Sequence, residues 1–583
     1  MNAAPSTRSA EPLHFRHWPP GHPHHLELPA TSLWYNLEVS ATRYPDRAAI
    51  VFYDSILTYA DLRRDAQALA GWLQAHCGVA RGDRVLLDMQ NSPQFAVAYY
   101  AILRADAFVV PVNPMLKTEE LRHYAADSGA RVVIAAQEVW PQIAPLMASE
   151  AGGVATLTHA LVCAYSDALT APTDLVVPDF VRAPLTVASG GSVTRWRDAL
   201  AAAHVPRPPE AGPDDWCVMP YTSGTTGKPK GCIHTHRTVM HTLVGGSVWA
   251  GSRTDVVALG VLPIFHVTGM QAMNGLIYSA GTNVILPRWD RSVAAEAIAH
   301  YRVTHFTCIP TMMIDFLGNP ELPRYDVSSL TYIAGGGAAM PEAIAQKMKD
   351  LWGLDFIEGY GLSETIAPSH INPMHRPKKQ CLGIPMYDTD CRIVDPQTLA
   401  EVAHGEVGEI ITHGPQVFQG YWNDPDKTAA AFIEHDGKRF FRTGDLARID
   451  EDGYYFMVDR LKRMINASGY KVWPAEVEAI LYRHPGVQEA CIIGAKDAYR
   501  GETVKAVIVP RADWKDRLAA ADIIAWARDE MAAYKVPRLV EFVDALPKSG
   551  TGKVMWRALQ EAEAAKTVAP LILLCHTWSL FVD

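Results

Sequence analysis

The sequence predicts a multidomain α/β protein. In the first part of the 583-residue chain, segments with apolar residues at helical spacing alternate with short apolar runs typical of strands. Strands that alternate with helices favour parallel sheets with crossover helices. The alternating segments span residues 62–73, 84–89, 95–103, 108–112, 284–286, 293–299 and 305–309. From about residue 405, short alternating runs separated by glycine turns favour antiparallel strands instead.

The chain divides into four segments on these patterns. A compact α+β pattern begins after 460–462, so we place a domain boundary at Lys462. The main domain is then expected over 31–461 and a smaller domain over 462–566. Residues 1–30 are rich in proline and histidine and are expected to form a disordered arm. Residues 567–583 form an apolar tail that falls short of the roughly 20 residues needed to span a bilayer.

Composition excludes some classes of function. The formal net charge of −10 argues against a nucleic-acid-binding protein, which normally carries a basic surface. The nine cysteines are scattered without C-x-x-C pairs, so the sequence indicates neither a disulfide framework nor a zinc site. The N-terminus lacks the charged-then-apolar layout of a signal peptide. We therefore expect a reducing, cytoplasmic setting with no integral membrane span, and leave peripheral membrane association open.

The segment from Tyr221 to Gly231, YTSGTTGKPKG, has the composition of a polyphosphate-binding loop. Glycines let backbone N–H groups turn toward an anion, while hydroxyls and lysines add donors and charge. The segment is not a Walker A motif, because Thr222 stands at the first glycine position and Pro229 comes directly after Lys228. A Gly/Ser/Thr surface loop is the alternative for such a segment taken alone.

Four further segments share this polar, glycine-rich character. Two of them, 335–337 (GGG) and 358–364 (EGYGLSE), come directly after expected strands, and ligands of parallel sheets bind at the carboxyl ends of strands. In the second, Glu364 offers a hard oxygen suited to Mg²⁺. The others are 441–445 (FRTGD), where Asp445 could accept ribose hydroxyls, and 547–553 (PKSGTGK). Each segment taken alone is also compatible with an ordinary turn.

Taken together, these segments resemble the adenylate-forming superfamily, in its acyl-CoA synthetase branch. The matching strings are YTSGTTGKPKG, GYGLSE, FRTGD, DRLKRMINASGYKVWPAEVE and PKSGTGK, in family order over about residues 30–560. The resemblance implies a large N-terminal domain of stacked α/β sheets with a β-barrel-like part, and a small mobile α+β C-terminal domain. It also implies two half-reactions. A carboxylic acid and ATP give acyl-AMP and pyrophosphate, and CoA then gives acyl-CoA and AMP.

The resemblance assigns roles to individual residues. Lys553 would reach the attacking carboxylate and the α-phosphate, His266 would lie beside the reacting carbonyl, and Glu364 would bind Mg²⁺. Asp445 and Arg460 would hold the ribose and its surroundings, and Tyr360 would stack on adenine. The remaining ATP- or AMP-binding residues would be Thr222, Ser223, Gly224, Thr225, Thr226, Gly227, Lys228, Gly336, Gly337, Glu358, Gly359, Gly361 and Ser363.

For the second half-reaction, the resemblance implies rotation of the C-terminal domain about a hinge at Lys462. Rotation would bring Ser468, Gly469 and Tyr470 to the site, where Gly469 lets pantetheine pass close to the backbone. Some positions depart from the commoner pattern of the superfamily, namely Phe441, Trp556 and Gln560. They put in doubt only details of how the C-terminal domain docks.

The sequence partly indicates which carboxylic acid and which acyl acceptor the enzyme would use. The chain continues for about 30 residues after Lys553, which leaves no room for a carrier domain, and no aspartate for a substrate amine occurs in 264–274. A free CoA ligase for a non-amino acid is therefore favoured. The expected acyl pocket is mostly apolar, which suits a medium- or long-chain fatty acid, with an aryl or cinnamate-type acid as the alternative. Its residues would be Val267, Thr268, Met270, Ile309, Thr311, Met312 and Ala339.

Other interpretations stay open at this point. An acyl-AMP-forming enzyme that uses another acceptor is the less favoured alternative, and a homodimer is compatible with the sequence. A P-loop ATPase is disfavoured by Pro229. A non-catalytic nucleotide- or acyl-binding homologue is weakly supported, because Lys553, Glu364 and Asp445 are all present.

Overall fold

The structure is a computed structural model that describes residues 12–222, 228–467, 470–497, 501–515, 517–549 and 553–576. Two compact units make up the chain. The first comprises residues 1–391, 411–442 and 450–455, and the second comprises 392–410, 443–449 and 456–583.

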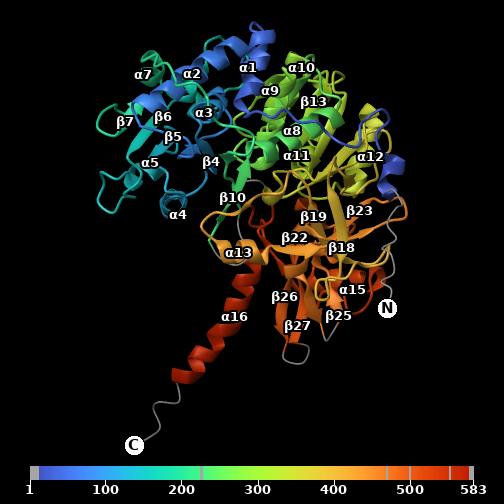
Figure 1. Cartoon of the computed structure of the whole chain (residues 1–583). Helices are drawn as coiled ribbons and strands as arrows, with labels where there is room; N and C mark the ends of the chain where they lie inside the picture. The colour runs from blue at the N-terminus through green and yellow to red at the C-terminus, as the bar shows by residue number, and fades with distance from the viewer. Residues whose placement is uncertain are drawn as a thin grey trace, which may run out of the picture. The chain divides into compact units, whose positions relative to one another are not determined.

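The first unit contains a nine-stranded sheet, sheet A, in which six neighbouring strands are parallel. Its strand β13 is labelled in Figure 1, near helices α9, α10 and α11. Antiparallel pairing occurs only at its two ends, where β16 and β17 extend one edge and β2 the other. In spatial order its strands are β17 (Ile384–Pro385), β16 (His370–Ile371), β15 (Phe356–Tyr360), β14 (Tyr332–Gly336), β13 (His305–Cys308), β11 (Val257–Gly260), β12 (Thr282–Ile285), β1 (Ala48–Phe52) and β2 (Ser55–Thr58).

A second nine-stranded sheet of the same unit, sheet B, also has a parallel centre. Its parallel strands are β8, β4, β3, β5, β6 and β7, and β10 joins β8 in antiparallel fashion. The order is β20 (Gly420–Tyr421), β10 (Lys230–Thr235), β8 (Trp216–Val218), β4 (Phe108–Val112), β3 (Arg84–Asp88), β5 (Val132–Ala136), β6 (His159–Cys163) and β7 (Val193–Arg195), with β9 (Tyr221–Thr222) beside β10.

Helices α1, α2, α3, α8 and α9 share one hydrophobic core with residues of both sheets. Local sequence explains where they start: Thr58 forms a capping box with Asp61 at α2, and Ser92 caps α3 ahead of Pro93. The helices of this unit are α1 (Trp34–Arg43), α2 (Tyr59–Ala75), α3 (Pro93–Arg104), α4 (Thr118–Ser128), α5 (Trp140–Ile143), α6 (Asp179–Arg182), α7 (Trp196–Ala201), α8 (His236–Trp249), α9 (Val267–Ser279), α10 (Arg291–Tyr301), α11 (Pro310–Leu317), α12 (Glu342–Trp352) and α13 (Pro425–Ala430).

The predicted alternation of helices and parallel strands is confirmed. The run predicted over 108–112 is β4, and the helical pattern over 62–73 lies inside α2. A third sheet runs in the order β18 (Asp390–Val394), β19 (Gly408–His413), β22 (Lys438–Ile449) and β21 (Phe432–His435), with β23 (Tyr455–Arg460) beside β22. These are the short alternating runs that begin near residue 405.

Residues 12–30 differ from the expected disordered arm, because they pack on the first unit. Trp18 is buried and makes edge-to-face contacts with Trp249 and Tyr387. The His22 ring lies 2.8 Å from the hydroxyl of Tyr387, and the His25 ring 2.6 Å from Asp388. Aromatic burial and polar contacts hold this segment in spite of its proline content.

The second unit contains a small sheet in the order β25 (Tyr470–Val472), β24 (Ile465–Ala467), β27 (Gly501–Pro510) and β26 (Val487–Asp497), with β28 (Leu539–Phe542) beside β27. Helices α14 (Pro474–Leu481), α15 (Ala520–Glu530) and α16 (Trp556–His576) complete it. The first part of the apolar segment 567–583 thus continues α16. Among the residues that the structure describes, we find no helix with both the length and the apolar composition of a membrane span.

Candidate functional site

The ends of β14 and β15 approach each other so closely that only glycine fits. A Cβ added at Gly336 would lie 2.2 Å from the carbonyl oxygen of Gly359, and one at Gly335 would lie 1.8 Å from that of Cys308. Gly337 comes next, with a φ of 84°, a backbone conformation that side chains disfavour. The glycines therefore keep the carboxyl edge of sheet A clear of side chains, where ligands of parallel sheets bind.

Glu358, which we predicted among the nucleotide-binding residues, has a carboxylate that is bonded to backbone. Its Oε1 accepts from the N–H of Gln380 at 2.8 Å, and its Oε2 accepts from that of Met340 at 3.4 Å. Burial raises the pKa of Glu358 to about 7, although these backbone donors act in the opposite direction. The carboxylate thus ties the segment after β14 to a second loop and positions the glycine-rich edge.

The turn after β15 carries Tyr360 and Ser363. The Tyr360 ring is buried, and its centroid lies 5.6 Å from that of His370. His234 of β10 contacts the carbonyl oxygen of Ser363 at 2.8 Å through Nε2, and burial lowers the pKa of this histidine to about 4. A neutral imidazole therefore donates to that carbonyl and holds the turn in place. Sequence analysis did not single out His234.

Glu364 lies at the end of this turn beside two groups from sheet B. The hydroxyl of Tyr421 donates to its Oε1 at 2.9 Å, and the Nζ of Lys230 lies 3.8 Å from the centre of the Tyr421 ring. Glu364 itself is buried. A buried carboxylate oriented by a phenol, with a lysine over the face of that ring, is a hard anionic ligand of the kind that Mg²⁺ prefers. Tyr421 and Lys230 were not among the predicted site residues.

The predicted phosphate-binding loop is only partly described. Residues 223–227, which include the predicted Ser223, Gly224, Thr225, Thr226 and Gly227, lie outside the described residues. On either side of them, β9 and β10 pair, with Thr222 opposite Lys230 and Tyr221 opposite Gly231. The Tyr221 hydroxyl donates to Asp127 at 2.6 Å. Lys228 is exposed. The two ends of the loop are therefore held together by the sheet that carries Lys230.

Three predicted residues of the second unit lie near one another. The Nε of Arg460 is 3.0 Å from the Oδ1 of the fully buried Asp445. Lys553 as a whole residue is exposed. Loss of hydration at its ammonium and the nearby Arg460 cation lower the pKa of Lys553, and the Asp445 carboxylate raises it. Residues 445, 460 and 553 are thus within electrostatic reach of one another in the fold.

The segment around Lys553 and the predicted hinge have simple local structures. Ser549 and Lys553 bond through their backbones at 2.8 Å, and Lys548 and Val554 form an antiparallel bridge. Lys462 is exposed in a short 3₁₀ turn between β23 and β24. The predicted CoA-binding residues Ser468 and Gly469 lie outside the described residues, and Tyr470 opens β25.

The predicted acyl-pocket residues have differing environments. His266 caps the start of α9 by accepting from the N–H of Thr268 at 3.4 Å. Val267 and Met270 are buried in the core of the first unit. The others are half-buried or exposed at the surface of the unit: Thr268, Ile309, Met312, Thr311 and Ala339.

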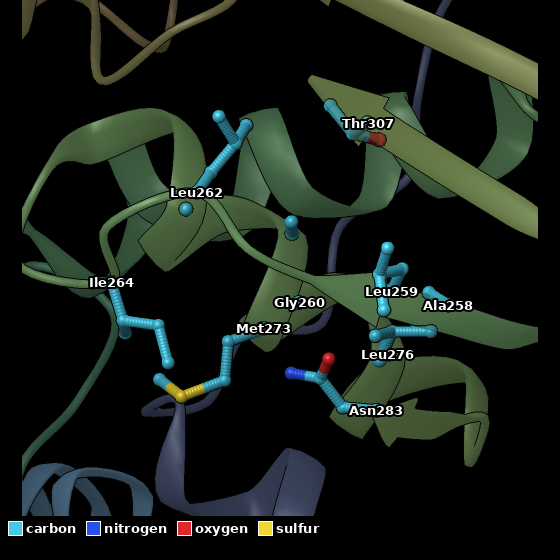
Figure 2. A pocket seen from close by; sticks show the side chains of 11 residues that line it. Ala258, Leu259, Gly260, Leu262, Ile264, Met273, Leu276, Asn283 and Thr307 are labelled. Atoms are coloured by element: carbon cyan, nitrogen blue, oxygen red, sulfur yellow. The ribbon is translucent and has the colours of Figure 1, made fainter. Parts of the chain in front are cut away.

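A cavity lies beside α9, and Figure 2 shows its lining side chains; Val267 and Met270 are not among them. Helix residues at i, i+3, i+4 and i+7 line it, and strands of sheet A line the opposite side. The lining residues are Ala258, Leu259, Gly260, Leu262, Ile264, Gly269, Ala272, Met273, Leu276, Asn283 and Thr307. The helical spacing of residues 269–276 was the sequence signal that could have identified this face.

Comparison with known proteins assigns the family. The sequence profile of the AMP-binding enzyme family matches residues 37–422, and that of the AMP-binding enzyme C-terminal domain matches residues 476–553. The chain belongs to this family, the adenylate-forming superfamily, in its acyl-CoA synthetase branch. The resemblance inferred from the motifs is thereby confirmed.

Individual relatives align over most of the chain. It is 36% identical over 555 residues to a long-chain-fatty-acid–CoA ligase of Bacillus subtilis (strain 168), covering 93% of this chain and 96% of that protein. It is 36% identical over 516 residues to a feruloyl-CoA synthase of an Amycolatopsis species, covering 88% and 95%. The crystal structure of ATP-bound MatB from Rhodopseudomonas palustris superposes with a TM-score of 0.80 at 28% identity, covering 92% and 99%.

Proposed function

We propose that this protein is an ATP-dependent acyl-CoA synthetase that acts on a carboxylic acid with a long apolar part, a medium- or long-chain fatty acid being favoured. It would join the acid to AMP with release of pyrophosphate, and then transfer the acyl group to CoA. The observation that carries this proposal is the placement of Glu364 beside Tyr421 and Lys230, at the base of the loop 221–231. It combines a magnesium ligand with cations and donors suited to polyphosphate.

In the first half-reaction a carboxylate oxygen attacks the α-phosphorus of ATP, and the bond to the β-phosphate breaks. Two anions repel each other as they approach, so the site must supply positive charge where negative charge develops. Lys553 would supply it at the reacting oxygens, and Lys228 and Lys230 at the leaving pyrophosphate. Mg²⁺, held by Glu364, would neutralise phosphate charge when bound. Because the Tyr421 hydroxyl already orients Glu364, little reorganisation is needed.

In the second half-reaction the CoA thiol attacks the acyl carbonyl carbon. AMP then leaves together with the oxygen that joined its phosphate to that carbon. The same lysine is not required for this step. We propose that the second unit reorients about Lys462 and brings the segment 468–470 to the reaction centre. The exposed Lys462 in the 3₁₀ turn at 461–463 supports this hinge, whereas the next residue, Arg463, is anchored by its ion pair with Glu478.

The relatives support a long apolar acid. The long-chain-fatty-acid–CoA ligase is as similar in identity as the feruloyl-CoA synthase and aligns over more of the chain. The cavity beside α9 is lined mainly by apolar side chains, which suits an acyl group in either case. An aryl acid of the cinnamate type is therefore the alternative substrate.

Lys553→Ala tests the mechanism. ATP–pyrophosphate exchange should fall by about 10²–10³-fold, because a group that stabilises the developing charge is lost. Conversion of supplied acyl-AMP to acyl-CoA should change little. Lys462→Pro should do the reverse, since it stiffens the hinge but leaves the adenylation groups in place.

Lys548→Ala is a matched control, because Lys548 bridges Val554, the neighbour of Lys553, but its own ammonium pairs with Glu489 at 2.9 Å. It should retain both half-reactions. Equal loss of both half-reactions in the Lys553 and Lys462 variants would contradict a rearrangement between the two steps. Absence of exchange with every acid in a panel, despite ATP binding, would contradict the proposed enzyme itself.

A further inference from the structure

Helix α4 contacts both described ends of the loop 221–231 through two side chains on one of its faces. The Nε2 of His123 lies 2.8 Å from the carbonyl oxygen of Pro229, and the carboxylate of Asp127 accepts from the Tyr221 hydroxyl at 2.6 Å. His123 and Asp127 are four residues apart in the helix, so their side chains are neighbours on its surface. A single helix face therefore holds the segment that enters the loop and the segment that leaves it.

The contact at Pro229 fixes the backbone between two lysines. Pro229 lies between Lys228 and Lys230, and because proline has no N–H, its carbonyl is the backbone group through which it can be held. A carbonyl only accepts, so the Nε2 of His123 carries the hydrogen in this contact. The peptide unit is planar, so fixing this carbonyl also fixes the peptide that joins Pro229 to Lys230 at the start of β10.

The contact at Tyr221 combines a hydrogen bond with ring packing on the same helix. The ring of Tyr221 lies 4.4 Å, centroid to centroid, from that of the buried Tyr124. Burial and the hydrogen bond to Asp127 both raise the pKa of Tyr221, so its hydroxyl keeps the proton that it donates. Tyr221 pairs with Gly231 across β9 and β10. The helix thus holds the beginning of the loop as firmly as its end.

The last turn of α4 also holds the segment that follows Tyr421. Carbonyl groups at the end of a helix lack partners within the helix. That of Asp127 accepts from the Nε1 of Trp422 at 2.8 Å, and the backbone N–H of Trp422 donates to the carbonyl oxygen of Gly231 at 2.8 Å. Trp422 comes directly after Tyr421, which orients Glu364. Helix α4 is therefore connected to each described group that would meet magnesium and pyrophosphate.

We propose that His123 is a positioning residue for adenylation, because by holding the carbonyl of Pro229 it directs the ammonium groups of Lys228 and Lys230 toward the leaving pyrophosphate. This inference rests on the proposed function and assigns a role to a side chain outside the reacting groups. The Nζ of Lys230 lies 3.8 Å from the centre of the Tyr421 ring, so a shift of the adjoining peptide would displace this cation. Cations held in place before the reaction stabilise developing charge without reorganisation.

The expected defect is confined to steps that contain pyrophosphate. ATP binding and ATP–pyrophosphate exchange require the lysines to meet the β- and γ-phosphates. Conversion of supplied acyl-AMP to acyl-CoA involves neither phosphate, so it does not depend on where these lysines point. A general loss of stability would instead lower both half-reactions by the same factor. The difference between the two activities therefore separates positioning from a structural role.

His123→Leu in the full-length protein removes the donor. The KM values for ATP and for pyrophosphate should each rise by about 3–10-fold in exchange with dodecanoate, which is the loss expected for one hydrogen bond. Conversion of supplied dodecanoyl-AMP to the CoA thioester should not change. His123→Gln should restore both KM values, because the glutamine amide nitrogen is as many bonds from Cβ as the histidine Nε2 and also donates.

His413→Leu is the matched control, because the Nδ1 of His413 lies 2.9 Å from the carbonyl oxygen of Arg439 and the residue is also half-buried. It should leave the KM values for ATP and pyrophosphate unchanged. If His123→Leu folds poorly, Tyr221→Phe replaces it. That variant keeps the ring against Tyr124, loses the bond to Asp127, and should raise the same two KM values. Unchanged KM values in Tyr221→Phe would then overturn the proposal.

The proposal is overturned if His123→Leu leaves both KM values unchanged, if His123→Gln does not restore them, or if acyl-AMP conversion falls in parallel with exchange. Failure of the proposed function gives a different result, which is no exchange by the wild type with any acid. In that case calorimetric titration with magnesium pyrophosphate compares the wild type with His123→Leu directly. Equal affinities would then overturn the positioning role as well.

Discussion

The two nine-stranded sheets of the first unit are built alike but differ at the carboxyl ends of their parallel strands. In sheet A, β14 and β15 end in glycines whose backbones approach so closely that no side chain fits. In sheet B, β3 ends at Asp88, which is almost fully buried, and the next residues pack against protein. One of these, Asn91, donates to the carbonyl oxygen of Leu262 at 2.9 Å.

The difference shows that parallel topology alone does not make a ligand site. Both sheets present carboxyl strand ends, where ligands of this architecture bind. In sheet A glycine removes the side chains that would occupy the edge, and Glu358 ties the adjoining loops by backbone bonds. In sheet B, Asn91 after β3 is bonded within the protein, whereas both carboxylate oxygens of Asp88 are buried without a hydrogen-bond partner among the described residues. Sheet B contributes to the candidate site through its antiparallel edge, which carries Lys230 and Tyr421.

The largest expected effect comes from adding a methyl group at the edge of sheet A. Gly336→Ala should reduce the free energy of unfolding by about 4 kcal/mol and abolish adenylation, because the Cβ would meet the Gly359 carbonyl oxygen, which is backbone and cannot move aside. Gly246→Ala on α8 is the control, since nothing lies within 4 Å of its added Cβ. Thermal unfolding and ATP–pyrophosphate exchange measure both. Near-normal stability of the first variant would contradict the close approach of the strands.

Glu364→Gln should reduce the rate of adenylation by about 10²–10³-fold at a fixed magnesium concentration. The amide keeps the shape and a carbonyl that can accept from Tyr421, but it lacks the charge that attracts a divalent cation. Titration of the exchange rate with Mg²⁺ measures the change. An unchanged dependence on magnesium would show that Glu364 is not a metal ligand.

Asp88→Asn tests whether the buried carboxyl group at the end of β3 in sheet B lowers the stability of the fold. Burial raises the pKa of Asp88 to about 7, the nearby Glu138 carboxylate contributing, so the folded state holds a proton that the unfolded state releases near pH 4. The wild type therefore loses stability as the pH rises from about 4 to 7, and the asparagine variant does not. At pH 8 the variant should be more stable by on the order of 2–4 kcal/mol.

At pH 4 the variant and the wild type should differ little in stability, because the carboxyl group is protonated in the folded state and still about half protonated in the unfolded state. Tm measured across this range checks the sign. A difference that stays constant from pH 4 to 8 would contradict the raised pKa.

The smallest effect is expected for Tyr421→Phe, which removes the hydrogen bond to Glu364 but keeps the ring beneath Lys230. Exchange should fall by about tenfold, since hydrogen bonds to charged groups contribute about 1.5–3 kcal/mol. The loss should appear as a higher magnesium requirement. Combining the change with Glu364→Gln should add little, because both alter the same contact.

The residues show why some of these features could be predicted and others could not. The glycines at 335–337, 359 and 361 were recognisable because each lies at or directly after a predicted strand, which is a local signal. Contact of Glu358 with nucleotide stays a prediction, and the structure adds that its carboxylate accepts from the backbone N–H groups of Met340 and Gln380. Tyr421 was missed because it is 57 residues from Glu364 in the chain and meets it only through the fold. The predicted acyl residues Val267 and Met270 are buried in the core and do not line the cavity beside α9.

The sequence alone determined the alternating α/β architecture, the glycine-rich edges and the superfamily, because hydrophobic period, turn chemistry and motif order are properties of neighbouring residues. Only the tertiary structure decided which polar groups meet. The Glu364–Tyr421 bond joins the two sheets, and Asn283 faces a cavity bounded by α9 and β11. Such contacts depend on the order of strands in a sheet and on which face each helix turns to it, and chain spacing does not encode either directly.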